Sequence, residues 1–147
     1  QWNKIKKIEG KRDETYNPYS EINPYLPLML KTIEIGKISS EFKFDWKDYK
    51  GPLSKVKEEL DEVIIEKKKE KINQKKMEEE IGDLLFSVIN LARHLNVNPE
   101  ISLMQSNKKF IKRFNLMTNS YGGKKKFINA KPKKKEELWN KAKKNLK

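Results

Sequence analysis

The sequence predicts an all-α protein built as an antiparallel helix bundle. Apolar residues recur three and four positions apart in successive segments, which is the period of an amphipathic helix. No segment shows the alternation of apolar and polar residues that marks a half-buried strand. The links between the periodic segments are short, and short links favour antiparallel neighbours. The length of 147 residues suits one domain, with or without an arm.

The first part of the chain predicts an arm followed by a helix. Residues 1–22 are mostly polar with scattered apolar anchors, so we interpret them as a linker or N-terminal arm and assign residues 23–147 to the helical domain. A helix is expected from Pro24 to Phe44, because apolar residues recur between Tyr25 and Ile38 and prolines are acceptable near a helix start. Residues 45–53, with Gly51-Pro52, predict a loop. Nearby aromatic residues are assigned to the core or to an interface: Phe42, Phe44 and Trp46.

The strongest helical patterns occupy the middle of the chain. A helix from Leu53 to about Lys71 carries an apolar stripe, and a second helix from Lys75 to Leu95 is the most apolar run. Asn96 to Asn98 end that helix, and Pro99 suits the first turn of a third one that runs to about Met117. Gly122-Gly123 and the lysine-rich residues 124–135 predict a loop. A short final helix is expected from Glu136 to Leu146, bearing Trp139.

Composition excludes several classes of protein. The chain has no cysteine, which excludes a disulfide scaffold and any thiolate-bound metal. A single histidine, His94, leaves no histidine cluster, so carboxylates are the expected ligands of any metal. No apolar run approaches the roughly 20 residues that span a bilayer, and no signal-peptide segment opens the chain. We therefore expect a cytoplasmic protein with no membrane partner.

The formal net charge of +13 raises the alternative of a nucleic-acid-binding module. Lysine supplies 31 of the 34 basic residues, whereas sequence-specific binding to bases relies mainly on arginine. Asn (13) and Ile (14) are also abundant, so we interpret the lysine surplus as a drift in composition. Nucleic acid is then not the expected partner, although charge alone does not decide between the two interpretations.

Acidic side chains repeat on two consecutive helices beside the apolar stripes. Glu59, Glu62 and Glu66 fall on one flank of the first, and Glu80 and Asp83 on one flank of the second. If the two apolar stripes pack together in antiparallel fashion, the two flanks converge at the rim of a dry core. Such carboxylates repel one another, and Mg²⁺, which takes oxygen ligands, would neutralise them. The alternative is that these are ordinary solvated helix faces paired with nearby lysines.

Three segments together resemble the MazG family of nucleoside triphosphate pyrophosphohydrolases. They are residues 55–62 (KVKEELDE), residues 78–95 (EEEIGDLLFSVINLARHL) and residues 107–114 (NKKFIKRF). The family signature EExxE followed by ExxD is met by the following residues: Glu58, Glu59, Glu62, Glu80 and Asp83. The resemblance extends from about Phe44 to Trp139 and is to the C-terminal half of two-domain members.

The resemblance implies an activity and a site. Members hydrolyse NTPs and dNTPs between the α- and β-phosphates with Mg²⁺, on a four-helix core in a homodimer whose subunits complete each other's nucleotide pocket. By motif position, the expected metal ligands are Glu59, Glu62, Glu80 and Asp83. The expected nucleotide-binding residues are Lys55, Glu58, Lys76, Glu79, Asp83, Lys109, Arg113 and Trp139. Glu58 and Glu59 are both candidates for the catalytic general base.

Two departures from the family pattern leave an alternative open. The chain lacks the N-terminal half of two-domain members, and residues 118–132 match the family poorly. A truncated, catalytically inactive remnant that binds nucleotide in a regulatory role is therefore the alternative to an enzyme. The intact acidic motif favours the enzyme.

Overall fold

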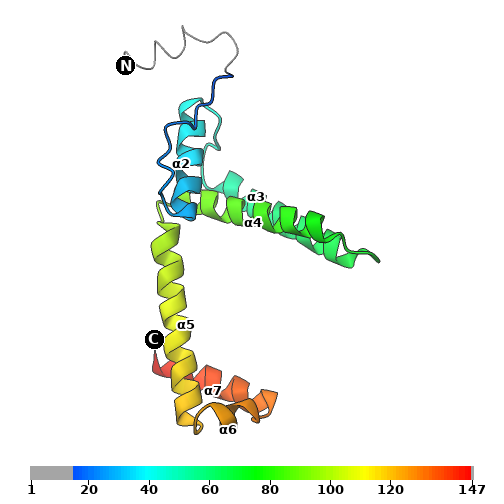
Figure 1. Cartoon of the computed structure of the whole chain (residues 1–147), viewed down its shortest axis with the longest axis vertical. Helices are drawn as coiled ribbons and strands as arrows, with labels where there is room; N and C mark the ends of the chain where they lie inside the picture. The colour runs from blue at the N-terminus through cyan, green and yellow to red at the C-terminus, as the bar shows by residue number, and fades with distance from the viewer. Residues whose placement is uncertain (1–14, 147) are drawn as a thin grey trace. The chain divides into compact units, whose positions relative to one another are not determined.

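The computed structural model describes residues 15–146, and it confirms the predicted all-α class (Figure 1). No strand occurs among these residues. The helices are α2 (Leu28–Glu41), α3 (Lys50–Lys68), α4 (Gln74–His94), α5 (Pro99–Ser120), α6 (Lys124–Ile128) and α7 (Pro132–Asn145). The chain divides into two compact units after Leu95: α2 to α4 belong to the first, and α5 to α7 to the second. Most of the expected arm, residues 1–14, lies outside the described residues.

Helices α3 and α4 form an antiparallel hairpin, and α2 packs on α4 (Figure 1). The hairpin closes through residues 69–73, where the Asn73 side chain caps α4 by accepting a hydrogen bond from the Lys76 N–H at 3.1 Å. Helix α2 begins at Leu28 rather than at Pro24. The Asn23 side chain accepts from the Tyr25 N–H and holds a turn there, and Pro27 is extended (ψ 143°).

The α3–α4 pair buries charge between its helices and leaves much of its apolar surface outside. Glu59, Glu66 and Glu80 are buried, with at most 7% of their surface exposed. Stripe residues that were expected to pack in a dry core are instead 41–58% exposed: Leu60, Ile64, Ile81, Leu85 and Val88. The prediction that the stripes pack on each other within this unit is therefore wrong, because the helix faces that meet are the acidic ones.

The second unit is a helical hairpin in which α5 packs against α7 and α6. Its core holds Met117, Phe127 and Ala142. Gly122 and Gly123 have φ of 92° and 86°, a backbone conformation that favours glycine, and they separate α5 from α6. The predicted loop over residues 124–135 is wrong in part: Phe127 anchors the short helix α6 in the core, and Pro132 starts α7 four residues before Glu136.

Among residues 15–146, no helix is long and apolar enough to cross a membrane.

Candidate metal and nucleotide site

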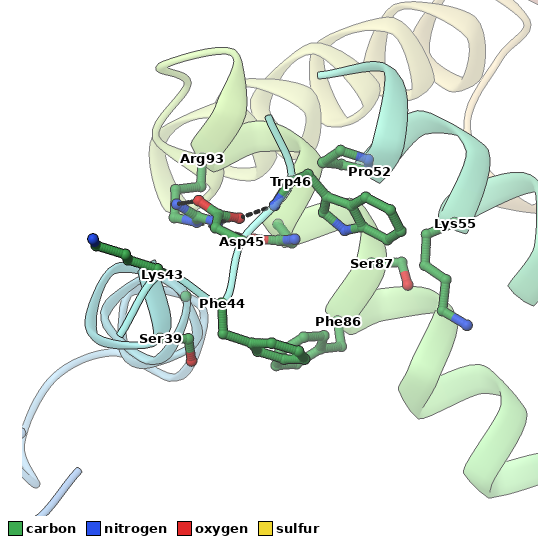
Figure 2. A pocket seen from close by; sticks show the side chains of 12 residues that line it. Ser39, Lys43, Phe44, Asp45, Trp46, Pro52, Lys55, Phe86, Ser87 and Arg93 are labelled. Carbon is green, nitrogen blue, oxygen red and sulfur yellow. Dashed lines mark hydrogen bonds and ion pairs between the residues drawn. The ribbon is translucent and has the colours of Figure 1, made fainter. Parts of the chain in front are cut away.

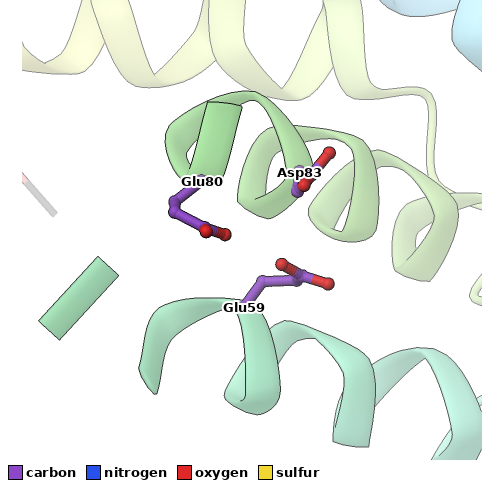
Figure 3. Close-up of side chains that lie close together, drawn as sticks. All are labelled: Glu59, Glu80 and Asp83. Atoms are coloured by element: carbon purple, nitrogen blue, oxygen red, sulfur yellow. The ribbon is translucent and has the colours of Figure 1, made fainter. Parts of the chain in front are cut away.

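Three carboxylates from two helices meet between α3 and α4. Glu59 comes from α3, and Glu80 and Asp83 come from α4; one carboxylate oxygen of each lies within 4.8 Å of the others (Figure 3). Glu59 and Glu80 are buried and Asp83 is exposed. We call these three residues the acidic cluster. Figure 3 shows the Glu59 side chain directed from α3 toward the two side chains on α4.

Each buried carboxylate of the acidic cluster is paired with a lysine one turn earlier on its own helix. Lys55 Nζ lies 2.6 Å from Glu59 Oε1, and Lys76 Nζ lies 2.8 Å from Glu80 Oε1. Hydrogen bonds to Glu58 and then to Glu59 raise the pKa of Lys55, and the hydrogen bond to Glu80 raises the pKa of Lys76. Both lysines therefore stay charged, and they offset the repulsion between the carboxylates.

The two helices carry the same eight-residue pattern, Lys-x-x-Glu-Glu-x-x-Glu/Asp, in opposite directions. On α3 it covers residues 55–62 and on α4 residues 76–83. The acidic half of this repeat is visible in the sequence. Pairing with nearby lysines was the alternative interpretation of these faces, and the structure shows that Lys55 and Lys76 each pair with the buried carboxylate of their own helix.

Two neighbouring glutamates on α3 lie apart from the acidic cluster. Glu62 is exposed and is not among the three residues that meet. Glu66 is buried at the hairpin end, where its carboxylate accepts from Lys69 Nζ and from the Asn73 N–H at 3.0 Å. These hydrogen bonds lower the pKa of Glu66, the one from Lys69 most. Glu66 thus fastens the turn between the helices, while Glu62 faces solvent.

Three further residues expected at the nucleotide lie in the second unit. The Arg113 guanidinium carbon stands 5.7 Å from the centre of the Trp139 ring, and Phe110 packs against that ring at 5.3 Å. Arg113 Nε is buried without a hydrogen-bond partner. Lys109, Lys108 and Lys112 line a shallow hollow of about 260 Å³. Trp139 therefore packs on α5, with Arg113 over its ring.

A larger hollow lies in the first unit, and sequence reasoning missed it. Its volume is about 440 Å³, and its lining comes from the end of α2, the α2–α3 loop, α3 and α4 (Figure 2). Phe44, Trp46 and Phe86 line it with aromatic rings, and we call it the aromatic pocket. Phe42, Phe44 and Trp46 are 56%, 83% and 50% exposed, so they do not belong to the core of the described residues, and their assignment to an interface stays a prediction. The aromatic residues Phe44 and Trp46 are the signal that the sequence offers, and the contact of their loop with Arg93 on α4 is visible only in the structure.

A partly buried ion pair fixes one wall of the aromatic pocket. Arg93 donates to both carboxylate oxygens of Asp45, at 2.6 and 3.0 Å, and His94 Nε2 lies 2.9 Å from Asp45 Oδ1. The hydrogen bonds from Arg93, followed by those from His94 and the Trp46 N–H, hold the pKa of Asp45 at about 2 although burial opposes this. The loop that carries Phe44 and Trp46 is thereby tied to the end of α4.

The fold and the acidic cluster define an all-α protein with a candidate carboxylate metal centre between two antiparallel helices. Residues 49–117, which include both acidic helices, match the family model of the MazG nucleotide pyrophosphohydrolase domain. Residues 49–117 therefore form a MazG-family domain.

Two curated proteins illustrate this relationship. The nucleoside triphosphate pyrophosphohydrolase/pyrophosphatase MazG of Thermotoga maritima is 42% identical over 118 residues, which are 80% of this chain and 44% of that protein. The nucleoside triphosphate pyrophosphohydrolase of Escherichia coli K12 is 39% identical over 113 residues, 77% of this chain and 43% of that protein. The chain therefore spans less than half the length of the curated relatives that it matches.

Proposed function

We propose that the chain is a Mg²⁺-dependent nucleoside triphosphate pyrophosphohydrolase, which converts NTPs and dNTPs to the monophosphate and pyrophosphate. The acidic cluster carries this proposal, because it lies on the two helices that the family model covers. The two relatives are named as nucleoside triphosphate pyrophosphohydrolases, which supports the same reaction. Such an activity serves the upkeep or regulation of nucleotide pools, which also favours a cytoplasmic location.

The acidic cluster fits a hard divalent cation. Three carboxylate oxygens within 4.8 Å of one another are the donor type that Mg²⁺ prefers, and the exposed side of Asp83 leaves room for water and phosphate ligands. We assign the metal to Glu59, Glu80 and Asp83, and retain Glu62 as a further ligand to be tested. When bound, Mg²⁺ supplies charge neutralisation on the polyphosphate and a more acidic water.

The chain itself supplies cations to hold the phosphates. Lys55 and Lys76 border the acidic cluster, and a polyphosphate would compete with Glu58 and Glu79 for their ammonium groups. Residues 96–147 contain 15 of the 34 basic residues but only three of the 21 acidic ones. Lys109 and Arg113 belong to this strongly basic unit, and a surplus of positive charge attracts triphosphates. Trp139 is a candidate contact for the base or the ribose.

Glu58 and Glu59 remain the two candidates for the general base that takes a proton from the attacking water. Glu59 is buried within the acidic cluster, whereas the Glu58 side chain is 61% exposed and 2.8 Å from Lys55 Nζ. Glu58→Gln and Glu59→Gln separate the two roles. Loss of a base lowers kcat with metal affinity intact, and loss of a ligand lowers metal affinity.

We propose a homodimer as the functional unit. The exposed apolar faces of α3 and α4 form a surface that a second copy of this chain would cover. In such a dimer the neighbouring subunit would complete the nucleotide pocket. Light scattering coupled to size-exclusion chromatography measures the mass directly, and Leu85→Lys should shift it toward the monomer.

Product analysis tests the proposed reaction. The purified chain is incubated with ATP and with each dNTP, with and without Mg²⁺, and the products are separated by ion exchange. Monophosphate with pyrophosphate, formed only with Mg²⁺, supports the proposal. Diphosphate with phosphate contradicts it. Nucleotide binding without turnover supports the inactive regulatory alternative, and salt-sensitive binding of nucleic acid without hydrolysis supports the lysine-rich binding module.

A further inference from the structure

The aromatic pocket lies beside the acidic cluster, and none of the sequence motifs accounts for its aromatic walls. We propose that it receives the base of the nucleotide, so that Trp46, Phe86 and Asn90 determine which bases the chain accepts. This inference rests on the proposed function, because it assigns the base of the same substrate. It also moves the base contact away from Trp139, the tryptophan that the motif position suggested.

The size and walls of the pocket suit a flat heterocycle. A volume of about 440 Å³ lies within the range of small-molecule sites, about 300–1,000 Å³. In Figure 2, Trp46 lies across the hollow from Phe44 and Phe86. Aromatic faces on two sides of a cavity can stack on a planar ring, and such stacking tolerates every base. The pocket therefore favours a nucleobase over a sugar or an aliphatic ligand.

Helix α4 supplies part of the polar lining of the pocket, through Ser87, Asn90 and Arg93. Asn90 Oδ1 accepts a hydrogen bond from Arg93 Nε at 3.0 Å, so the Asn90 amide group is oriented with its N–H donors free to face a ligand. Ser87 is 95% buried and lines the hollow (Figure 2). A base presents carbonyl oxygens and ring nitrogens at its edge, which these donors match.

Two glycines show that the walls of the pocket are built for close packing. A Cβ on Gly51 would stand 2.4 Å from Trp46 Cε3, so the indole lies directly on the glycine backbone. A Cβ on Gly36 would stand 2.5 Å from Arg93 Nε, so the Arg93 side chain that reaches Asp45 passes directly over this glycine. The Trp46 N–H donates to Asp45 Oδ1 at 2.8 Å. The Trp46 backbone is therefore tied to Asp45, and its ring lies against Gly51 without a ligand, which favours a lower entropy cost of binding.

The pocket and the acidic cluster share a residue and a helix face. Lys55 lines the pocket and pairs with Glu59 of the cluster. On α4, residues 80, 83, 87 and 90 follow one another at helical spacing on a single face, with the cluster at one end and Asn90 at the other. Seven residues separate Asp83 from Asn90, about 10 Å along the helix. A nucleotide can thus reach from the pocket to the cluster.

Steady-state kinetics of Trp46→Ala tests the assignment. Since base stacking on an aromatic side chain is strong, we expect the KM for NTPs to rise about 5- to 100-fold while kcat changes less. Trp46→Phe should restore most of the affinity, because it keeps a stacking face. Tyr25→Ala is the matched control: Tyr25 is 91% exposed at the surface near α2, and its removal should leave KM unchanged.

Binding without chemistry separates this inference from the proposed function. In a Trp2→Phe, Trp139→Phe background, Trp46 is the sole tryptophan, and AMP or CMP without Mg²⁺ should quench its fluorescence. Asn90→Leu should weaken that quenching at least severalfold and change the ratio between the two nucleotides. Quenching by ribose 5-phosphate of the same strength would overturn the inference, because it would locate the sugar and phosphate there.

Three combinations of the kinetic, mass and fluorescence results decide between the pocket assignment and the proposed function. If the chain hydrolyses NTPs but Trp46→Ala leaves KM unchanged, the inference is wrong and the proposed function stands. If Trp46→Ala shifts the mass measured in solution from that of a dimer toward that of a monomer without changing KM, a second copy of the chain occupies the pocket. The inference is then also wrong. If nucleotides quench Trp46 without any hydrolysis, the pocket assignment stands and the proposed reaction fails.

Discussion

Arg93 Nη2 lies 2.6 Å from Asp45 Oδ1, and this ion pair joins the end of α4 to the loop before α3. Both side chains are mostly buried, with 13% and 21% of their surface exposed. A bidentate guanidinium–carboxylate pair fixes orientation as well as distance. The α2–α3 loop therefore has a set position although it contains no regular structure.

The Asp45–Arg93 pair predicts a dependence of stability on pH. The folded-state pKa of Asp45 is about 2, below its ordinary value of 3.8, so its contribution is present above about pH 4 and is lost as the pH falls toward 2. Asp45→Asn should flatten the free energy of unfolding across that window, measured by urea unfolding at several pH values. Asp61→Asn, at an exposed position on α3, is the control. An unchanged pH profile in Asp45→Asn would refute the role assigned to this pair.

Gly51→Ala should disturb the aromatic pocket more than the fold. The added Cβ would meet the Trp46 ring at 2.4 Å, so the ring must move, and we expect a loss of roughly 1–3 kcal/mol in the free energy of unfolding with a shifted Trp46 emission. Gly82→Ala is a matched control within α4, because a Cβ there meets nothing within 4 Å. That change should instead stabilise the helix by about 0.5–1 kcal/mol. Equal effects of the two substitutions would show that Trp46 does not rest on Gly51.

Removal of a carboxylate from the acidic cluster should stop turnover without unfolding the chain. Glu59→Gln or Asp83→Asn should lower kcat about 100-fold or more and weaken Mg²⁺ binding, with helicity by circular dichroism unchanged. Glu62→Gln is the informative comparison, because Glu62 lies outside the cluster in the free chain. A loss as large as that of Glu59→Gln would place Glu62 among the ligands. Full activity in both Glu59→Gln and Asp83→Asn would reject the metal assignment.

Trp139→Ala distinguishes packing from nucleotide contact in the second unit. Trp139 packs against Phe110 and lies under Arg113, so its loss should destabilise the α5–α7 hairpin by roughly 3–5 kcal/mol. Trp139→Phe should keep the packing. If Trp139 contacts the base or ribose, Trp139→Phe raises the KM for NTPs, while its unfolding midpoint stays near that of the parent chain. An unchanged KM would leave it a packing residue.

The helices were predictable from the sequence because their periodicity is strong and their ends carry clear signals. Asn73 and Asn98 cap α4 and α5 as their residue type favours, and Pro99 starts α5 as expected. The lysine-rich stretch before Trp139 was harder. It contains one buried apolar residue of α6, Phe127, among many lysines, so the sequence predicts a loop where the helix α6 forms.

The site was predictable in its chemistry but not in its surroundings. The spacing of Glu80 and Asp83 places both carboxylates on one face of α4, and the hairpin brings Glu59 to them. Spacing could not show that the acidic faces, rather than the apolar ones, lie between the helices. Nor could it reveal the aromatic pocket, because Trp46 reaches its place through a tertiary ion pair, Asp45 with Arg93, 48 residues apart.

Because the same pattern occurs on α3 and α4, the charges of the site are arranged alike when followed from either end of the hairpin. Each lysine precedes its buried carboxylate by one turn, and the helices run in opposite directions, so Lys55 and Lys76 stand at opposite ends of the acidic cluster. A string of phosphates laid along the hairpin would therefore meet an ammonium group at each end and the carboxylate-bound cation in the middle. Charge at the site alternates positive, negative, positive along the helix axis, and the hairpin offers the two ends of a polyphosphate equivalent electrostatic anchors.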